Sequence, residues 1–173
     1  MSNTQSEYTA YCLFCKTGSE QKIAGRIEKT CAALAYSPAR VKSEYKNGTW
    51  TTRNVALLPG YVFIYTIGDA PFSLIRSFTD VLGFLKYGDG TGELYGNDLK
   101  IALWVLQHKG AFGLSKALRI GEHIKIVEGP LMEYEGTLSM VNKQKRLAKV
   151  DIVIGNTAKT LWLSFEWVEA MEN

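Results

Sequence analysis

The sequence predicts an α+β fold in two parts: an N-terminal α/β sandwich over residues 8–109 and a small C-terminal β-barrel over residues 118–173. In the first part, helical and strand-like apolar patterns are mixed around an antiparallel hairpin, which indicates a sheet flanked by helices. The C-terminal part has only short alternating segments broken by turns, as is typical of a small barrel without exposed edges. Residues 110–117 contain glycine and lack apolar periodicity, which predicts a linker.

The N-terminal part is expected to begin with a strand over residues 8–15 and an amphipathic helix. Thr17 and Glu20 have the spacing of a capping box, in which a hydroxyl and a carboxylate satisfy the free amides of a helix start. Apolar residues then recur at steps of four, four and three, which predicts a buried helical stripe. The stripe consists of Ile23, Ile27, Cys31 and Leu34.

Two turn signals organise residues 38–66, where we expect two or three strands. Asn47-Gly48 between strand-like segments is a strong hairpin signal. Pro59-Gly60 suits a type II turn, because proline fixes φ and glycine accepts a positive φ. Residues 61–66 alternate as a strand with apolar side chains on both faces.

After residue 66 we expect a short helix near residues 70–78, a strand near 83–87 and a longer helix capped by Asn97. One stripe of the longer helix is expected to face the core. It consists of Leu99, Ala102, Leu103 and Leu106. Further apolar residues on other faces predict a second contact, namely Ile101, Trp104 and Val105.

The strands of the C-terminal part are expected between turns at Gly129-Pro130, 142–144 and Gly155-Asn156. Alternating apolar residues should line the barrel interior. They are Ala148, Val150, Ile152, Ile154, Leu161, Leu163 and Phe165. The β-branched residues among 150–154 favour a strand and disfavour a helix, so we expect a stable barrel.

Composition predicts a cytoplasmic protein with no membrane segment. The net charge is +3, no apolar run reaches the roughly 18 residues of a membrane span, and the polar start lacks a secretory pattern. The three cysteines are an odd number, which argues against a disulfide framework. Cys12 and Cys15 form a C-x-x-C, but on a strand they leave on opposite faces, so buried thiols are expected and no metal site.

The sequence contains no recognisable catalytic motif. It has no G-x-S-x-G, no H-E-x-x-H and no phosphate-binding loop, and it has only two histidines. We therefore expect a binding protein with no catalytic residues and no cofactor, and the question becomes what it binds.

Three segments in order resemble the NusG family of bacterial transcription elongation factors. They are LLPGYVF at 57–63, VLGFLKYG at 81–88 and RIGEHIKIVEGP at 119–130. The resemblance extends from about residue 8 to residue 169. It implies a NusG-type N-terminal domain and a C-terminal KOW domain, which is an SH3-like barrel.

The resemblance also implies docking to the clamp helices of RNA polymerase through an apolar hollow. The positions that match these contacts are Phe14, Leu58, Tyr61 and Phe63. Each could instead belong to the domain core. We favour Leu58 as a contact residue because a turn leaves an apolar side chain exposed more easily.

A nucleic-acid contact in the N-terminal part is implied by the segment YCLFCKTGSEQ at 11–21, which resembles the first strand of the specialised paralogue RfaH. In RfaH-like factors this surface touches the displaced non-template DNA strand, and Lys16 matches a basic position there. Helical spacing places Lys22, Arg26 and Lys29 on one face, where they could bind phosphates or could be solvated surface.

The C-terminal part departs from the general family in residues 152–162, which suggests a specialised antiterminator resembling the LoaP group. The residues with which general NusG proteins meet the termination factor Rho are missing, so Rho is not expected as a partner. Trp162 should point out of the barrel near a basic cluster, as an RNA-binding surface requires, or else pack under the linker or residues 167–171. The cluster consists of Lys143, Lys145, Arg146 and Lys149.

Together these features predict a monomeric transcription elongation and processive antitermination factor that binds RNA polymerase and suppresses pausing or termination. RNA is the favoured nucleic-acid partner, with non-template DNA as the alternative, and a ribosomal protein is left open. The competing functions are a ribosome-associated KOW module and a general NusG that couples transcription to translation. A net charge of +3 is low for a ribosomal protein.

Overall fold

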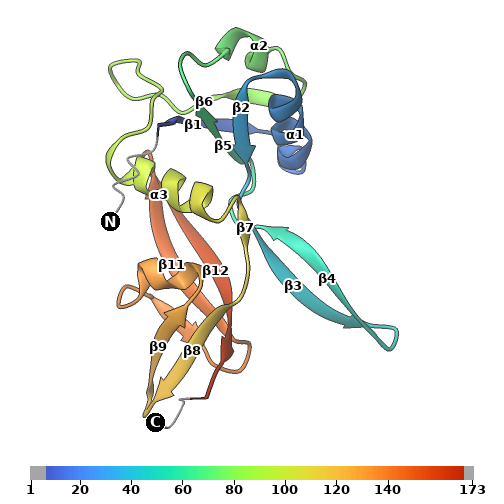
Figure 1. Cartoon of the computed structure of the whole chain (residues 1–173), viewed down its shortest axis with the longest axis vertical. Helices are drawn as coiled ribbons and strands as arrows, with labels where there is room; N and C mark the ends of the chain where they lie inside the picture. The colour runs from blue at the N-terminus through green and yellow to red at the C-terminus, as the bar shows by residue number, and fades with distance from the viewer. Residues whose placement is uncertain (1–6, 170–173) are drawn as a thin grey trace. The chain divides into compact units, whose positions relative to one another are not determined.

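The computed structural model describes residues 7–169, which divide into two compact units (Figure 1). Within the described residues, the first unit contains residues 7–38, 58–110 and 153–157, and the second contains 39–57, 111–152 and 158–169. No helix in the described part of the chain is long and apolar enough to cross a membrane. The predicted mixture of helices with antiparallel strands is confirmed.

The first unit is built on a four-stranded sheet with the order β2-β5-β1-β6. Its strands are β1 (Thr9–Cys15), β2 (Ala33–Tyr36), β5 (Tyr61–Thr66) and β6 (Val81–Phe84). β1 pairs antiparallel with both β5 and β6, and β5 pairs antiparallel with β2. The six residues of β5 are all buried, as a strand that is covered on both faces requires.

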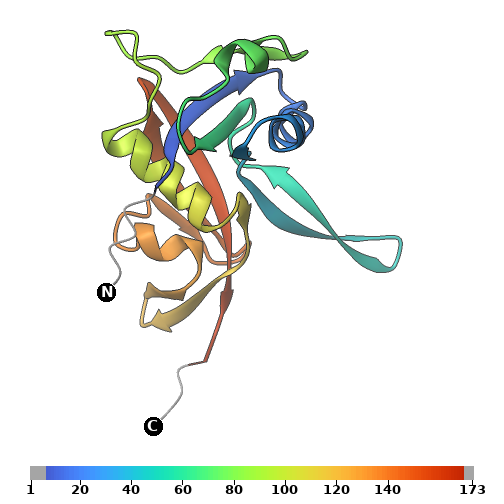
Figure 2. The ribbon, with the colours of Figure 1, turned by 45° about the horizontal axis from the view of Figure 1, so that its top comes forward.

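Helices cover both faces of this sheet (Figure 2). Helices α1 (Glu20–Thr30) and α2 (Phe72–Arg76) pack on one face, where Leu13 and Val62 belong to the same apolar core as Ile23 and Ile75. Helix α3 (Gly96–Gln107) lies on the other face, and the Tyr65 hydroxyl donates a hydrogen bond to its Ala102 carbonyl at 2.5 Å. The N-terminal sheet is therefore flanked by helices, as predicted.

Helix α1 begins at Glu20, later than a helix capped by Thr17 would, and its cap differs from the prediction. Ser19, and not Thr17, is the N-cap residue, and its hydroxyl donates to the Asp80 carboxylate at 2.8 Å. Helix α1 ends at Thr30. The prediction that Leu34 belongs to the helical stripe was therefore wrong, because Leu34 lies in β2.

The Pro59-Gly60 turn forms as predicted. Gly60 has a φ of +84°, and the Tyr61 amide donates to the Leu58 carbonyl at 3.1 Å. The Glu20 carboxylate accepts hydrogen bonds from the amides of Gly60 at 2.7 Å and Gly18 at 2.9 Å. A buried carboxylate thus ties the turn to the start of α1.

Replacing Glu20 by alanine should lower the free energy of unfolding by about 2–3 kcal/mol, because it leaves the Gly60 amide without its charged acceptor. Glu93→Ala, at an exposed position, is the matched control and should change it by less than about 0.5 kcal/mol. Urea unfolding followed by circular dichroism measures both values. Equal unfolding midpoints for the two variants would show that the carboxylate does not hold the turn.

Helix α3 differs from its prediction in cap and buried face. Tyr95 is the N-cap residue, while the Asn97 side chain donates to the Val153 carbonyl at 2.9 Å. The buried face is the one that was assigned to a second contact, and only Ala102 of the expected stripe is buried. The residues of this buried face are Asp98, Ile101, Ala102, Trp104 and Val105. The helix carries apolar residues on several faces, so periodicity alone did not identify the inner one.

The second unit contains a five-stranded sheet with the order β10-β11-β12-β8-β9. Its strands are β8 (Ser115–Ile120), β9 (His123–Glu128), β10 (Met140–Asn142), β11 (Leu147–Ile154) and β12 (Thr157–Trp167), with a 3-10 helix η1 (Pro130–Tyr134) after β9. The inward alternation predicted for β11 and β12 is confirmed, since all seven named residues are buried. β10 and β9 are the outer strands, and no ladder joins them within the described residues.

A hairpin completes the second unit. β3 (Ala39–Lys46) and β4 (Thr49–Ala56) form a twisted two-stranded ribbon (Figure 1), and positive φ angles at Asn47 and Gly48 confirm the predicted turn. β3 also pairs in parallel with β7 (Ala111–Phe112). The stretch predicted to be a linker, 110–117, thus contains β7 and the start of β8.

Candidate functional site

The predicted docking residues lie together on one end of the β1–β5 pair, mostly in the core. Tyr61 and Phe63 are buried, Phe14 is half-buried, and Leu58 is only 1% exposed. The expectation that the turn exposes Leu58 was therefore wrong. Its turn is drawn inward by the Glu20 carboxylate and by the Cys15 amide, which donates to the Gly60 carbonyl at 2.9 Å.

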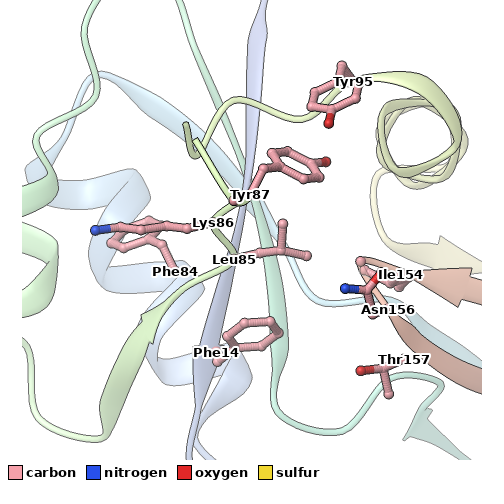
Figure 3. Close-up of a pocket in the computed structure, with 11 residues that line it drawn as sticks. Phe14, Phe84, Leu85, Lys86, Tyr87, Tyr95, Ile154, Asn156 and Thr157 are labelled. Carbon is pink, nitrogen blue, oxygen red and sulfur yellow. The ribbon is translucent and has the colours of Figure 1, made fainter. Parts of the chain in front are cut away.

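Phe14 is the predicted docking residue that reaches an open surface. Phe14 and Tyr61 are direct partners across β1 and β5, and their rings meet edge to face with centroids 5.1 Å apart. The Phe14 ring also lines a cavity of about 570 Å³ in the first unit (Figure 3). Tyr61 therefore acts as a buried support for the Phe14 ring.

The segment after β6 supplies much of the wall of this cavity. Figure 3 shows Phe14, Leu85 and Tyr87 directed toward the residues Ile154, Asn156 and Thr157, while Phe84 and Lys86 point the other way. The Tyr87 and Tyr95 rings lie 4.3 Å apart on the same wall. Leu85 and Tyr87 belong to the segment that carried the family resemblance, but no docking role was predicted for them.

Asp98 organises the cavity from helix α3. Its carboxylate accepts a hydrogen bond from the Tyr87 hydroxyl at 2.8 Å and another from the Gly155 amide at 3.0 Å. Burial and this bond to Asp98 raise the pKa of Tyr87 to about 12. The Tyr87 hydroxyl therefore stays protonated throughout the physiological pH range and keeps its hydrogen bond to Asp98.

The two thiols of the C-x-x-C segment are buried, as predicted. Burial raises the pKa of Cys15 to about 11 and also raises the pKa of Cys12. Both thiols are therefore protonated at neutral pH. No group of three or more His, Cys, Asp or Glu residues is placed to hold a metal within residues 7–169.

The predicted basic face of the N-terminal part is exposed on and before α1. Its members are Lys16, Lys22, Arg26 and Lys29. The Arg26 guanidinium stacks on the Phe78 ring at 4.0 Å. None of the four forms an ion pair with another described residue, so no acidic side chain of the described chain neutralises the face.

Two residues of the predicted basic cluster in the C-terminal part interact with other residues, and the other two are exposed without an ion pair in the described part of the chain. The Lys143 ammonium donates to the Glu122 carbonyl at 2.6 Å, and Lys149 pairs with Asp151 at 3.6 Å. Lys145 and Arg146, in the turn between β10 and β11, are exposed and form no ion pair within the described residues.

Trp162 has the parity predicted for it, opposite to the buried Leu161 and Leu163, but it is half-buried instead of fully exposed. Its side chain lines a cavity of about 340 Å³ in the second unit. The other lining residues are Arg40, Asn142, Lys145 and Leu147. Arg40 and Asn142 were not predicted. The alternative prediction placed Trp162 under the linker or under residues 167–171, of which 170 and 171 lie outside the described residues.

Comparison with known proteins decides the family. The model of the family described as "Transcription termination factor nusG" matches residues 10–97, which include all of β1 but its first residue, together with β5, β6 and the Pro59-Gly60 turn. The chain belongs to the NusG family. NusG-family proteins are transcription factors and not enzymes, so the chain is a NusG-family transcription termination/antitermination factor.

Individual relatives agree along most of the chain. "Transcription termination/antitermination protein NusG" of Buchnera aphidicola is 30% identical over 133 residues, which are 75% of this chain and 68% of the relative. The NusG of Escherichia coli K12 is 27% identical over 135 residues, covering 76% and 75%. These NusG relatives confirm the resemblance derived from the three sequence segments.

A solved structure described as "Domain interaction in Thermotoga maritima NusG" has a similar fold. It matches with a TM-score of 0.55 and 20% identity, and the match covers 91% of this chain and 93% of that one. At this identity the similarity supports the fold alone.

Proposed function

We propose that this NusG-family protein is a processive antitermination factor that binds RNA polymerase through the cavity beside Phe14. The observation that carries the proposal is the aromatic ring of Phe14 at an open cavity, in edge-to-face contact with the buried Tyr61 on the neighbouring strand. Leu58, Tyr61 and Phe63 shape this surface from the core, and Phe14 makes the contact. A helix of the polymerase clamp would place apolar side chains against the ring.

Changing Phe14 to glutamate should weaken polymerase binding by about 30-fold or more, because loss of an aromatic anchor at a hot spot costs about 2 kcal/mol and a buried charge adds to it. Ile67→Glu is the matched control, since Ile67 is 69% exposed and follows β5 at the far end of the β1–β5 pair. Binding is measured by biolayer interferometry with core RNA polymerase. Equal losses in the two variants would remove the cavity from the interface.

We also infer that the protein contacts nucleic acid, as a specialised paralogue of the RfaH or LoaP type. Two surfaces support this inference: the Lys16/Lys22/Arg26/Lys29 face and the surroundings of Trp162. We favour the second for RNA, because it combines unpaired cations with an aromatic ring. The five-stranded sheet would then serve as the SH3-like barrel of a KOW domain. Non-template DNA would be the partner of the first surface.

A further inference from the structure

The cavity beside Trp162 has the components of a binding site for one nucleotide unit. We call it the Trp162 cleft and define it by Arg40, Asn142, Lys145, Leu147 and Trp162. Its volume of about 340 Å³ lies at the lower end of the range of small-ligand sites. It contains an aromatic side chain for stacking and two cations for phosphate, drawn from β3, β12 and the β10–β11 turn.

Arg40 lacks an anionic partner within the described residues. Its guanidinium is half-buried and, among the residues that the structure describes, donates only to the neutral Ser164 hydroxyl, at 3.4 Å. Burial and the neighbouring Arg53 lower the pKa of Arg40, which is the direction expected for a cation that is desolvated without a counter-charge. A phosphate group in the cleft would supply that charge and a geometry that suits the guanidinium fork.

Asn142 holds the cationic turn in place. Its side-chain oxygen accepts a hydrogen bond from the Lys145 amide at 2.8 Å, which fixes the backbone that carries Lys145. Within the described residues the side-chain amide nitrogen of Asn142 donates no hydrogen bond, so its two hydrogen atoms can be donated to a ligand. Leu147 gives the cleft an apolar wall beside the Trp162 indole.

A second cavity continues the Trp162 cleft. It has a volume of about 410 Å³ and shares Arg40, Lys145 and Leu147 with the cleft. Its further cations are Arg146, which has no ion pair within the described residues, and Lys42, which is paired with Glu44 at 2.8 Å. Glu166 is the one acidic residue among those that line the two cavities. The two cavities together therefore offer cations to more than one phosphate.

We propose that the Trp162 cleft and the cavity beside it bind a single-stranded polynucleotide, with a base against Trp162 and successive phosphates on Arg40, Lys145 and Arg146. This inference rests on the proposed nucleic-acid contact, and it adds Arg40 from the β3–β4 hairpin to the binding surface. The stacking and the charges are common to RNA and DNA. Recognition would tolerate many base sequences, since every base has a face that can stack.

The test is fluorescence anisotropy of the full-length protein with a labelled 12-nucleotide oligouridylate and a labelled oligothymidylate. Trp162→Ala should weaken binding at least about fivefold, and Trp162→Phe should retain most of it. Arg40→Gln and Lys145→Gln should each weaken binding and reduce the slope of log affinity against log salt by about 0.7. The matched controls are Trp50→Ala and Lys125→Gln, at exposed positions outside both cavities.

The proposal would be overturned if the cleft variants bound the oligonucleotides with wild-type affinity. It would also be overturned if polyglutamate bound as tightly as the oligonucleotides and lost affinity in the same variants. Stronger binding of oligouridylate would identify RNA as the source of the strand, and equal binding would include DNA. The exposed Lys145→Gln variant provides a test even if Trp162→Ala destabilises the second unit. Because the cleft variants retain Phe14, their binding to polymerase reports separately on the proposed docking function.

Discussion

Phe63→Ala is expected to lower the free energy of unfolding by about 3–5 kcal/mol, the range for a phenylalanine removed from a packed core. Phe63 is completely buried in β5, opposite Cys12 in β1, two residues along the strand from Tyr61 of the Phe14–Tyr61 pair. Removal of its ring would leave a cavity between the sheet and its cover. The variant should also bind less polymerase, in proportion to the fraction of molecules whose first unit is unfolded.

Urea unfolding of the full chain, with Trp50→Ala as the exposed aromatic control, measures this effect. Trp50 is 70% exposed, so its truncation should change the free energy by less than about 0.5 kcal/mol. If Phe63→Ala keeps wild-type stability and still loses polymerase binding, Phe63 is a contact residue and its placement in the core is wrong.

Gly129→Ala is expected to cost several kcal/mol of stability in the second unit. Gly129 precedes η1 with a φ of +101°, and a Cβ atom there would lie 2.6 Å from the Ser115 Cα atom. Ser115 is fully buried, and its hydroxyl accepts a hydrogen bond from the Leu131 amide at 3.0 Å. The added methyl group would therefore have to displace backbone, not a flexible side chain.

Gly136→Ala is the matched control for this prediction. Gly136 also has a positive φ, +81°, but a Cβ atom there would have no neighbour within 4 Å. Its cost should be the conformational term alone, about 1 kcal/mol. Thermal unfolding midpoints separate the two terms, and similar midpoints for the two variants would show that the contact with Ser115 is not tight.

Local sequence signals predicted the turns and the strand alternation well. Asn47-Gly48 and Pro59-Gly60 specify backbone angles through their own covalent structure, and both turns form. The inward alternation of Ala148 to Ile154 along β11 is equally local, because successive side chains of a strand point to opposite faces.

Side-chain exposure and the composition of the site depended on contacts between distant residues. Leu58 is buried because Glu20, 38 positions earlier, binds the adjacent turn. The inner face of α3 is decided by the sheet beneath it. Arg40 shares a cavity with Trp162 although more than 120 residues separate them, and no pattern of charge or spacing indicated this juxtaposition.

Transcription through a terminator tests the central claim most directly, because it measures antitermination together with its dependence on the Phe14 surface. The assay is single-round transcription by bacterial RNA polymerase across an intrinsic terminator, with and without the full-length protein. We predict that wild type and Ile67→Glu increase read-through, whereas Phe14→Glu leaves it at the level without the protein. Read-through that is unchanged by wild type, or increased equally by Phe14→Glu, would contradict the account.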